Sequence, residues 1–256
     1  MIIPQFYIDD IIRNAIKEDI NYIDVSTVFV IPETQTGTAR FISKADGVVC
    51  GLEIAMRVFQ LLDDTFTYEA WFKDGDEVKK GDLIAVFSGK TACLLQGERT
   101  ALNLLQHLSG IATATNACVK AVEGTKASIA ETRKTLPGLR ALQKYAVTCG
   151  GGIANTVAIL RQKLGHTVKI EVETRNMDEV AQAVQAGADI IMLDNMSCEQ
   201  MKEACAFIDG RAVTEASGNV TLENIRKVAE TGVDIISLGA LTHSVKAFDI
   251  SMRIDK

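Results

Sequence analysis

The stretch AGADIIMLDN, residues 186–195, decides the fold, because TGVDIISLGA, residues 231–240, repeats its pattern. In both stretches a glycine ends an expected helix, and an apolar run typical of a buried parallel strand follows. A spacing of 22 residues leaves room for one strand, one helix and two short loops. The sequence therefore predicts repeated βα units that form a parallel α/β barrel. The strand-like runs begin near Val168, Ile190, Ala212 and Asp234.

One interval interrupts this period. An earlier strand is expected at 127–131, yet the next begins near Val168, about two units later. The interval holds two helical stretches, 138–147 and 154–164, joined by three glycines at 150–152. A βααβ step in an otherwise alternating barrel predicts that the barrel is incomplete.

The region before residue 110 has a mixed pattern. Apolar residues at helical spacing predict a helix over 5–18, and 98–117 is expected to form a long apolar helix. Short strand-like runs lie between them, at 38–43, 47–50, 65–71 and 83–88.

Acidic residues alternate with apolar ones in the run KIEVE, residues 169–173. If Ile170 and Val172 face helices, Glu171 and Glu173 face the barrel interior. Glu215 and Ser217 share a face of the strand that begins near Ala212, and Asp194 ends the strand that begins near Ile190. Acidic residues are therefore expected to converge at the carboxyl ends of the strands, where such barrels place active sites. Buried acids need counter-charges or a cation.

Arg133 and Lys134, after the first barrel strand, are the candidate positive partners of these acids. Two alternatives remain open: Glu171 forms a structural ion pair, and the basic pair is a solvated loop. His107, inside an apolar helix, is expected to be packed rather than catalytic.

Small residues follow the last two barrel strands, at Ser217-Gly218 and Gly239-Ala240. Without bulky side chains, backbone N–H groups can approach a phosphate there. His243 follows closely and is a candidate phosphate contact.

Composition excludes several protein classes. Hydrophobic residues make up 47% of the 256, charged residues 23%, and the net charge is −6, which argues against disorder and against binding nucleic acid. No apolar run is long enough to span a membrane, and the acidic N-terminal stretch does not read as a targeting signal. Six cysteines without a CxxC pair argue against a zinc knuckle or redox dithiol and favour a reduced cytoplasm.

Several motifs together resemble the quinolinate phosphoribosyltransferase family, the carboxylating nicotinate-nucleotide pyrophosphorylases among the type II phosphoribosyltransferases. The resemblance extends from the N-terminal region almost to the C-terminus. It rests on GERTALN at 97–103, ETRKTLPGLR at 131–140, CGGG at 149–152, ADIIMLDN at 188–195, EASG at 215–218 and GALTHS at 239–244.

This resemblance implies an N-terminal α/β sandwich domain over 1–110 and an open, incomplete α/β barrel over 111–245. It also implies that 246–256 packs back on the N-terminal domain. The implied enzyme is a pentosyltransferase of NAD biosynthesis, which converts quinolinate and phosphoribosyl pyrophosphate to nicotinate mononucleotide, pyrophosphate and CO₂ with Mg²⁺. The implied assembly is a cytoplasmic homodimer or a higher oligomer, in which each N-terminal domain caps the partner's barrel.

The resemblance also assigns roles to residues. Lys134, Glu173 and Asp194 match catalytic residues, and the two acids match groups that hold ribose hydroxyls and the metal-bound pyrophosphate, directly or through water. Arg99 matches an arginine that reaches quinolinate in the neighbouring subunit, and Arg133 matches one that binds its carboxylate. The remaining implied substrate contacts are Thr132, Ser217, Gly218, Gly239, Ala240 and His243.

The chain departs from the family after Gly152, where an Asn-His-Arg segment and a strand of roughly twenty residues are expected by resemblance. Either the natural protein carries this segment and the present chain lacks it, or the barrel has lost it. We favour the first, because losing a buried parallel strand is costly. The alternatives to quinolinate phosphoribosyl transfer are a related enzyme of the molybdenum-transport-associated type and, if the loss is real, a non-catalytic phosphate-binding homologue.

Overall fold

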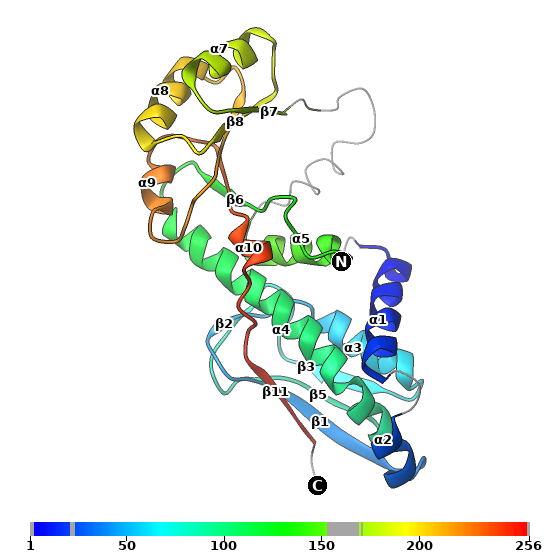
Figure 1. Ribbon diagram of the computed structural model, residues 1–256. Coiled ribbons are helices and arrows are strands. Elements are labelled where there is room, and N and C mark those ends of the chain that lie inside the picture. The colour runs from blue at the N-terminus through cyan, green and yellow to red at the C-terminus, as the bar shows by residue number, and fades with distance from the viewer. Residues whose placement is uncertain (1–2, 21–23, 153–168, 170, 255–256) are drawn as a thin grey trace. The chain divides into compact units, whose positions relative to one another are not determined.

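The computed structural model describes residues 3–20, 24–152, 169 and 171–254 (Figure 1). Its contacts divide the chain into two compact units. Unit 1 comprises 1–113, 137–149 and 245–256, and unit 2 comprises 114–136 and 150–244. Residues 137–149, which we expected in the barrel domain, thus belong to unit 1.

Unit 1 is built on a four-stranded antiparallel sheet with the order β11-β1-β5-β3. The C-terminal strand β11 (Ile250–Ile254) pairs with β1 (Thr36–Ser43), so the end of the chain completes the sheet of the N-terminal region. The other strands are β3 (Thr67–Ala70) and β5 (Leu83–Lys90), with a separate pair of β2 (Gly47–Val48) and β4 (Glu77–Val78). The helices are α1 (Gln5–Ile20), α2 (Val25–Val30), α3 (Leu52–Leu62), α4 (Thr91–Ala121), which continues into unit 2, and α5 (Arg140–Cys149).

Aromatic rings form the core between α3 and this sheet. Phe87 lies 4.8 Å from Phe41 and 4.9 Å from Phe59, measured between ring centroids, and Phe66 stacks on Phe59 at 5.4 Å. Phe41 and Phe59 are fully buried. Packing these large rings against one another buries apolar surface and stabilises the unit.

Unit 2 contains a five-stranded parallel sheet with the order β6-β10-β9-β8-β7 (Figure 1). This confirms the α/β fold and the repeated βα units. Residues 153–168 and 170, including the helix expected over 154–164, lie outside the described residues. The strands are β6 (Ser128–Ala130), β7 (Glu171–Thr174), β8 (Ile190–Asp194), β9 (Val213–Ser217) and β10 (Ile235–Ser237); the helices are α7 (Met177–Gln185), α8 (Cys198–Ile208), α9 (Ile225–Ala229) and α10 (Ala240–His243).

The strand register separates the side chains onto two faces. On one face, Ile191, Leu193 and Ile236 are fully buried beneath the helices. On the other face, Glu173, Met192 and Glu215 lie side by side, because they are register partners. The alternation in the sequence therefore predicted correctly that Glu173 and Glu215 share one face.

Acidic residues meet on this second face. Glu215 is 3% exposed, and burial raises the pKa of its carboxyl to about 7; a hydrogen bond from Ser237 opposes this shift, while Glu171 and Glu131 add to it. The neighbour of Glu171 at this point is another acid rather than a base. The sheet therefore buries an acidic group that is uncharged in part of the population at neutral pH.

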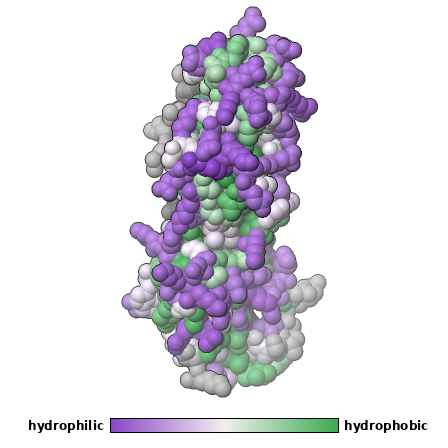
Figure 2. All heavy atoms as spheres, turned by 90° about the vertical axis from the view of Figure 1, so that its left-hand side faces the viewer, coloured by the Kyte–Doolittle hydropathy of each residue, from purple (hydrophilic) through white to green (hydrophobic). Residues whose placement is uncertain are grey.

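Hydrophilic residues cover most of the face of the molecule drawn in Figure 2. Among the described helices, none combines the length and the apolar character needed to cross a bilayer.

Replacing Phe59 with Ala should lower the free energy of unfolding by about 3–5 kcal/mol, because it leaves a cavity among the aromatic rings. Urea unfolding followed by the fluorescence of Trp71, the single tryptophan, measures this loss. Phe29→Ala, which removes a ring that is 74% exposed, is the matched control and should change stability by less than about 0.5 kcal/mol. Equal losses in both variants would contradict the assignment of the core.

Replacing Glu215 with Gln should flatten the dependence of stability on pH. The folded pKa of about 7 lies above the ordinary value of 4.5, so this carboxyl contributes most to stability below pH 4.5 and loses that contribution as pH rises to 7. The variant should therefore be more stable than the parent by roughly 1–3 kcal/mol at pH 8 and nearly equal at pH 4.5. Urea unfolding across this range tests the expectation, with Glu203→Gln, an exposed acid on α8, as control.

Candidate active site

The expected site residues of unit 2 lie at the carboxyl ends of its parallel strands, in two clusters. The first, here called the acidic cluster, combines the expected Glu173 and Asp194, near the ends of β7 and β8, with Arg175 and Asn195, which were not expected. The second, here called the loop cluster, is formed by the Thr132–Lys134 loop after β6 and the Gly239–His243 segment after β10. The strand order places them toward opposite sides of the same sheet edge.

Arg175 joins the two acids of the acidic cluster. Its Nη2 atom donates a 2.8 Å hydrogen bond to Oε1 of Glu173, and its Nε atom lies 3.9 Å from Oδ2 of Asp194. The Asp194 side chain is 20% exposed, against 50% for Glu173 and 68% for Arg175. The guanidinium thus lies over the acids on the solvent side and balances part of their charge. Arg175 was not among the expected site residues, although its position directly after the strand that carries Glu173 was a usable signal.

A chain of amide groups holds Asp194 from the other side. Asn195 donates from Nδ2 to Oδ2 of Asp194 at 3.0 Å and accepts at Oδ1 from Asn219 at 2.9 Å. Asn195 and Asn219 both have left-handed backbone conformations, with φ of 56° and 52°. Asparagine tolerates this region better than most residues, which explains its use at both positions.

Gly218 must be glycine at this point. Its φ is 92°, and a β-carbon there would collide with the side-chain amide of Asn195. Ser217, the last residue of β9, is the register partner of Asp194, and its carbonyl oxygen accepts the backbone N–H of Asn195. The SGN turn at 217–219 therefore fixes the position of the amide chain beside Asp194.

The loop cluster is held together by hydroxyl groups. Thr132 Oγ1 accepts the backbone N–H of Lys134 at 3.1 Å, and Thr242 Oγ1 donates to the Lys134 carbonyl at 2.8 Å. The side chains of Arg133 and Lys134 are exposed. These bonds fix the backbone of a short loop that presents two cations to solvent.

His243 lies against Gly239 in the same cluster. A β-carbon on Gly239 would come within 2.8 Å of Nε2 of His243, while Nδ1 of His243 lies 2.8 Å from the Ser244 hydroxyl. Ala240 is exposed at the start of α10. The small residues at 239 and 240 thus leave the histidine ring and the nearby backbone accessible together.

Arg99, an expected substrate contact, and His107, an expected packed histidine, belong to unit 1. Arg99, on α4, donates a 2.8 Å hydrogen bond to Asp19 and is 73% exposed. His107 lies 2.8 Å from the Gln143 amide nitrogen, and burial lowers its pKa, which agrees with the expectation that it is a packed histidine. Neither residue belongs to the two clusters of unit 2.

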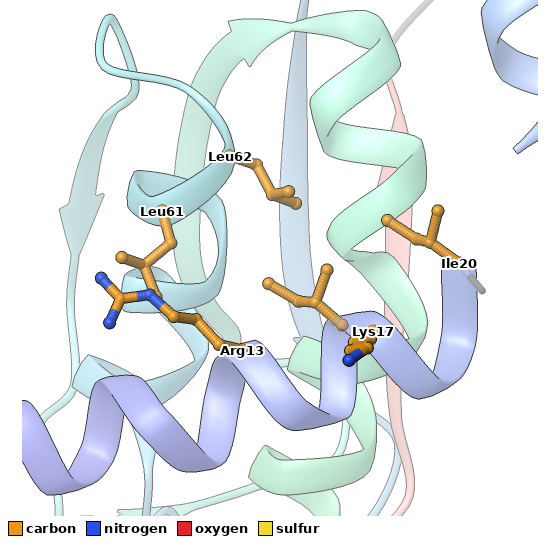
Figure 3. A pocket seen from close by; sticks show the side chains of 6 residues that line it. Arg13, Lys17, Ile20, Leu61 and Leu62 are labelled. Atoms are coloured by element: carbon orange, nitrogen blue, oxygen red, sulfur yellow. The ribbon is translucent and has the colours of Figure 1, made fainter. Parts of the chain in front are cut away.

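A hollow of about 320 Å³ also lies in unit 1, between α1 and α3 (Figure 3). Its lining is mainly apolar, and Arg13 at its rim lies 3.9 Å from both Asp9 and Asp10. None of the expected site residues lines it. The residues that line it are Arg13, Ile16, Lys17, Ile20, Leu61 and Leu62.

Chemically, the sheet edge of unit 2 offers carboxylates on one side and exposed cations with small-residue loops on the other. Carboxylate oxygens suit hard divalent cations such as Mg²⁺, and guanidinium or ammonium groups suit carboxylate or phosphate anions. Such a site fits the binding of anionic substrates together with a metal ion.

The chain matches two family models. The one described as the N-terminal domain of quinolinate phosphoribosyl transferase covers residues 24–109, and the C-terminal domain model covers 111–159 and 151–253. The two C-terminal matches overlap at 151–159, so the match is broken at the interval that interrupts the 22-residue period.

Curated relatives match nearly the whole chain. The probable nicotinate-nucleotide pyrophosphorylase [carboxylating] of Bacillus subtilis is 40% identical over 95% of this chain and 92% of its own length. The chloroplastic nicotinate-nucleotide pyrophosphorylase [carboxylating] of Arabidopsis thaliana is 37% identical over 98% of this chain and 84% of its own. The B. subtilis alignment spans 267 residues, whereas 95% of 256 is about 243, so this chain lacks about 24 of the aligned positions.

Solved structures agree with the sequence relatives. NadC from Streptococcus pyogenes is 36% identical with a TM-score of 0.89, and the nicotinate-nucleotide pyrophosphorylase from Francisella tularensis is 34% identical with a TM-score of 0.88. Each comparison covers 99% of this chain and 98% of the other. With both domain models and these relatives matched, the chain belongs to the quinolinate phosphoribosyltransferase family.

Proposed function

We propose that this chain transfers a phosphoribosyl group from phosphoribosyl pyrophosphate to quinolinate, forming nicotinate mononucleotide, pyrophosphate and CO₂. The observation that carries this is the sheet edge of unit 2, which presents the acidic cluster and the loop cluster in a chain of this family. The reaction needs no protein nucleophile. It needs groups that hold two anionic substrates and stabilise charge as bonds change.

The loop cluster is suited to the pyridine dicarboxylate. The planar guanidinium of Arg133 can bind a carboxylate through two parallel N–H donors, and the Lys134 ammonium adds a compact charge. The two hydroxyl hydrogen bonds that fix this loop limit the entropy lost when the substrate is bound.

The acidic cluster is suited to the ribose and the metal. Glu173 and Asp194 offer carboxylate oxygens, which are accessible enough to bind ribose hydroxyls and Mg²⁺, directly or through water and pyrophosphate. Mg²⁺ bound there would neutralise charge on the departing pyrophosphate. The two carboxylates would stabilise the positive charge that develops at C1 of the ribose.

The 5′-phosphate of the ribose fits the turns after β9 and β10. Gly218, Gly239 and Ala240 have no bulky side chains that would keep a phosphate from their backbone N–H groups, and Ser217 and His243 add side-chain donors.

Apart from one proton from solvent, the reaction needs no further reagent. The pyridine nitrogen forms a bond to C1 as the C1–pyrophosphate bond breaks. The resulting pyridinium accepts the electrons of the C2–carboxylate bond, CO₂ leaves, and C2 takes up a proton.

We further propose a cytoplasmic homodimer, or a higher oligomer, in which Arg99 reaches the neighbouring subunit's substrate. The exposure of this guanidinium makes it available to a partner, and release from Asp19 would be needed first.

A second candidate is a homologue that binds phosphoribosyl compounds without turnover. It is favoured by the broken family match and by the aligned positions that this chain lacks relative to the B. subtilis protein. A related phosphoribosyltransferase of the molybdenum-transport-associated type is disfavoured by the presence of both Arg99 and Arg133, which suit a dicarboxylate.

Pyrophosphate release that requires quinolinate tests the proposal directly. Release with quinolinate but not with nicotinate supports it, and absence of release in a folded protein that still binds phosphoribosyl pyrophosphate supports the second candidate. The intact mass of the natural protein completes the test: 27.7 kDa means a real loss of the family segment, whereas a mass higher by about 2 kDa, from roughly twenty residues, means that the segment is present.

Replacing Glu173 or Asp194 with Ala should lower kcat/KM by about 10²-fold or more, because each removes a charge placed beside the reacting carbon. Steady-state pyrophosphate release measures the effect. Asp189→Ala, at the opposite end of β8, is the control and should leave kcat within a few-fold of the parent. Near-normal turnover in both site variants would contradict the assigned roles.

Replacing Arg175 with Gln should lower the Mg²⁺ concentration needed for half-maximal rate by a few-fold, because the guanidinium competes with the cation for both carboxylates. Arg226→Gln breaks an equally short exposed pair, between Arg226 on α9 and Glu230 just after it, and should leave the Mg²⁺ requirement unchanged. A higher Mg²⁺ requirement in Arg175→Gln would instead show that the arginine helps to bind the anionic substrate.

A further inference from the structure

Two cysteines and an aspartate from three separate segments of unit 1 converge. The Sγ atoms of Cys50 and Cys149 and a carboxylate oxygen of Asp74 all lie within 4.8 Å of one another. Cys50 follows β2 and is fully buried, Asp74 lies in the turn before β4, and Cys149 ends α5. Asp74 is 24 residues after Cys50, and Cys149 is 75 residues further on, so no short motif could reveal the group.

The backbone around two of the three side chains, Cys50 and Asp74, is held in place by hydrogen bonds. The Cys50 backbone N–H donates to Ser109 Oγ at 3.0 Å. The turn that carries Asp74 is fixed by Gly75, whose N–H donates to the Val49 carbonyl at 2.8 Å. These bonds mean that Cys50 and Asp74 need little rearrangement to act together.

The carboxylate of Asp74 is oriented by two further donors. Its Oδ1 accepts the N–H of Leu52, the first residue of α3, at 2.9 Å, and its Oδ2 accepts the hydroxyl of Tyr145 at 2.8 Å. Both donors are uncharged, so the negative charge of Asp74 is solvated by them but not neutralised. Donors of this kind orient the ligands of metal sites and tune their affinity.

We propose that Cys50, Asp74 and Cys149 form a binding site for a thiophilic divalent cation such as Zn²⁺, with the fourth position left to water or to the Tyr145 oxygen. Two sulfurs and one carboxylate oxygen suit Zn²⁺ and do not suit Mg²⁺ or Ca²⁺. This site is separate from the acids of unit 2 and does not depend on the proposed reaction.

Charge balance makes binding feasible at a buried position. Without metal, two neutral thiols and one carboxylate carry a charge of −1. When both thiols release their protons to solvent and a divalent cation binds, two thiolates, one carboxylate and the cation again sum to −1. The group therefore takes up the ion without adding net charge to the interior, and affinity should fall at low pH because the protons compete.

The test uses the reduced, chelator-treated full-length protein, titrated with Co²⁺ and then with Zn²⁺. We expect one equivalent of Co²⁺ to give the intense visible and sulfur charge-transfer absorption of a tetrahedral thiolate site, and Zn²⁺ to displace it. Cys149→Ser and Cys50→Ser should abolish the absorption. Tyr145→Phe should weaken binding by about 10–100-fold, because it removes a donor to the Asp74 ligand.

Cys93→Ser is the matched control, because Cys93 is also a half-buried cysteine of unit 1 and lies outside the group. It should leave the titration unchanged. Cys50→Ser removes a buried thiol; if that variant does not fold, Cys149→Ser and Tyr145→Phe still decide the question.

Two outcomes would overturn the proposal. One is the absence of a thiolate spectrum in the folded, reduced parent. The other is a spectrum that persists in Cys149→Ser. A Cys50–Cys149 disulfide that forms readily in the parent, with no metal bound by the reduced form, would assign the pair to redox chemistry instead.

Discussion

Hydrogen bonding between parallel strands is the constraint on which the candidate active site depends. The register makes Glu173, Met192 and Glu215 neighbours, and it places Asp194 beside Ser217 and Ser237. A slip of one residue between two strands would turn each of these side chains to the helix-covered face. The side chains of the candidate active site are therefore brought together by the same backbone bonds that form the sheet.

The same register has an energetic cost. Side chains that share the interior face include several acids, and the most buried of them, Glu215, avoids a full charge at neutral pH through its raised pKa. Nearer the strand ends, Glu173 and Asp194 remain close to solvent and to Arg175. The acids of the sheet thus differ in depth. Proton uptake compensates the buried Glu215, whereas the exposed guanidinium of Arg175 compensates Glu173 and Asp194.

Much of this arrangement could be predicted from sequence because it is periodic. The spacing of 22 residues gave the parallel units, and the alternation in 169–173 gave the face that Glu173 and Glu215 share. Arg175 was not predictable in the same way, because its role depends on a long side chain that folds back across two strands. Likewise, the left-handed backbone of Asn195 and Asn219 is a local property that no period encodes. The grouping of Cys50, Asp74 and Cys149 depends on contacts between distant segments of an irregular domain.

The strand order also explains why one interval of the chain matters so much to function. Strands β7, β8, β9 and β10 are neighbours in sequence order, and β10 pairs next with β6, which precedes them all. The two edge strands of the described sheet are therefore β6 and β7, and the step of the chain that connects them runs from Ala130 to Glu171. That is the part of the chain in which the period fails and the family match breaks. Thr132–Lys134 follows β6 and Glu173 ends β7, so the two clusters flank this step. A family segment inserted there would adjoin both, which makes its presence or loss a question about catalysis as well as about stability.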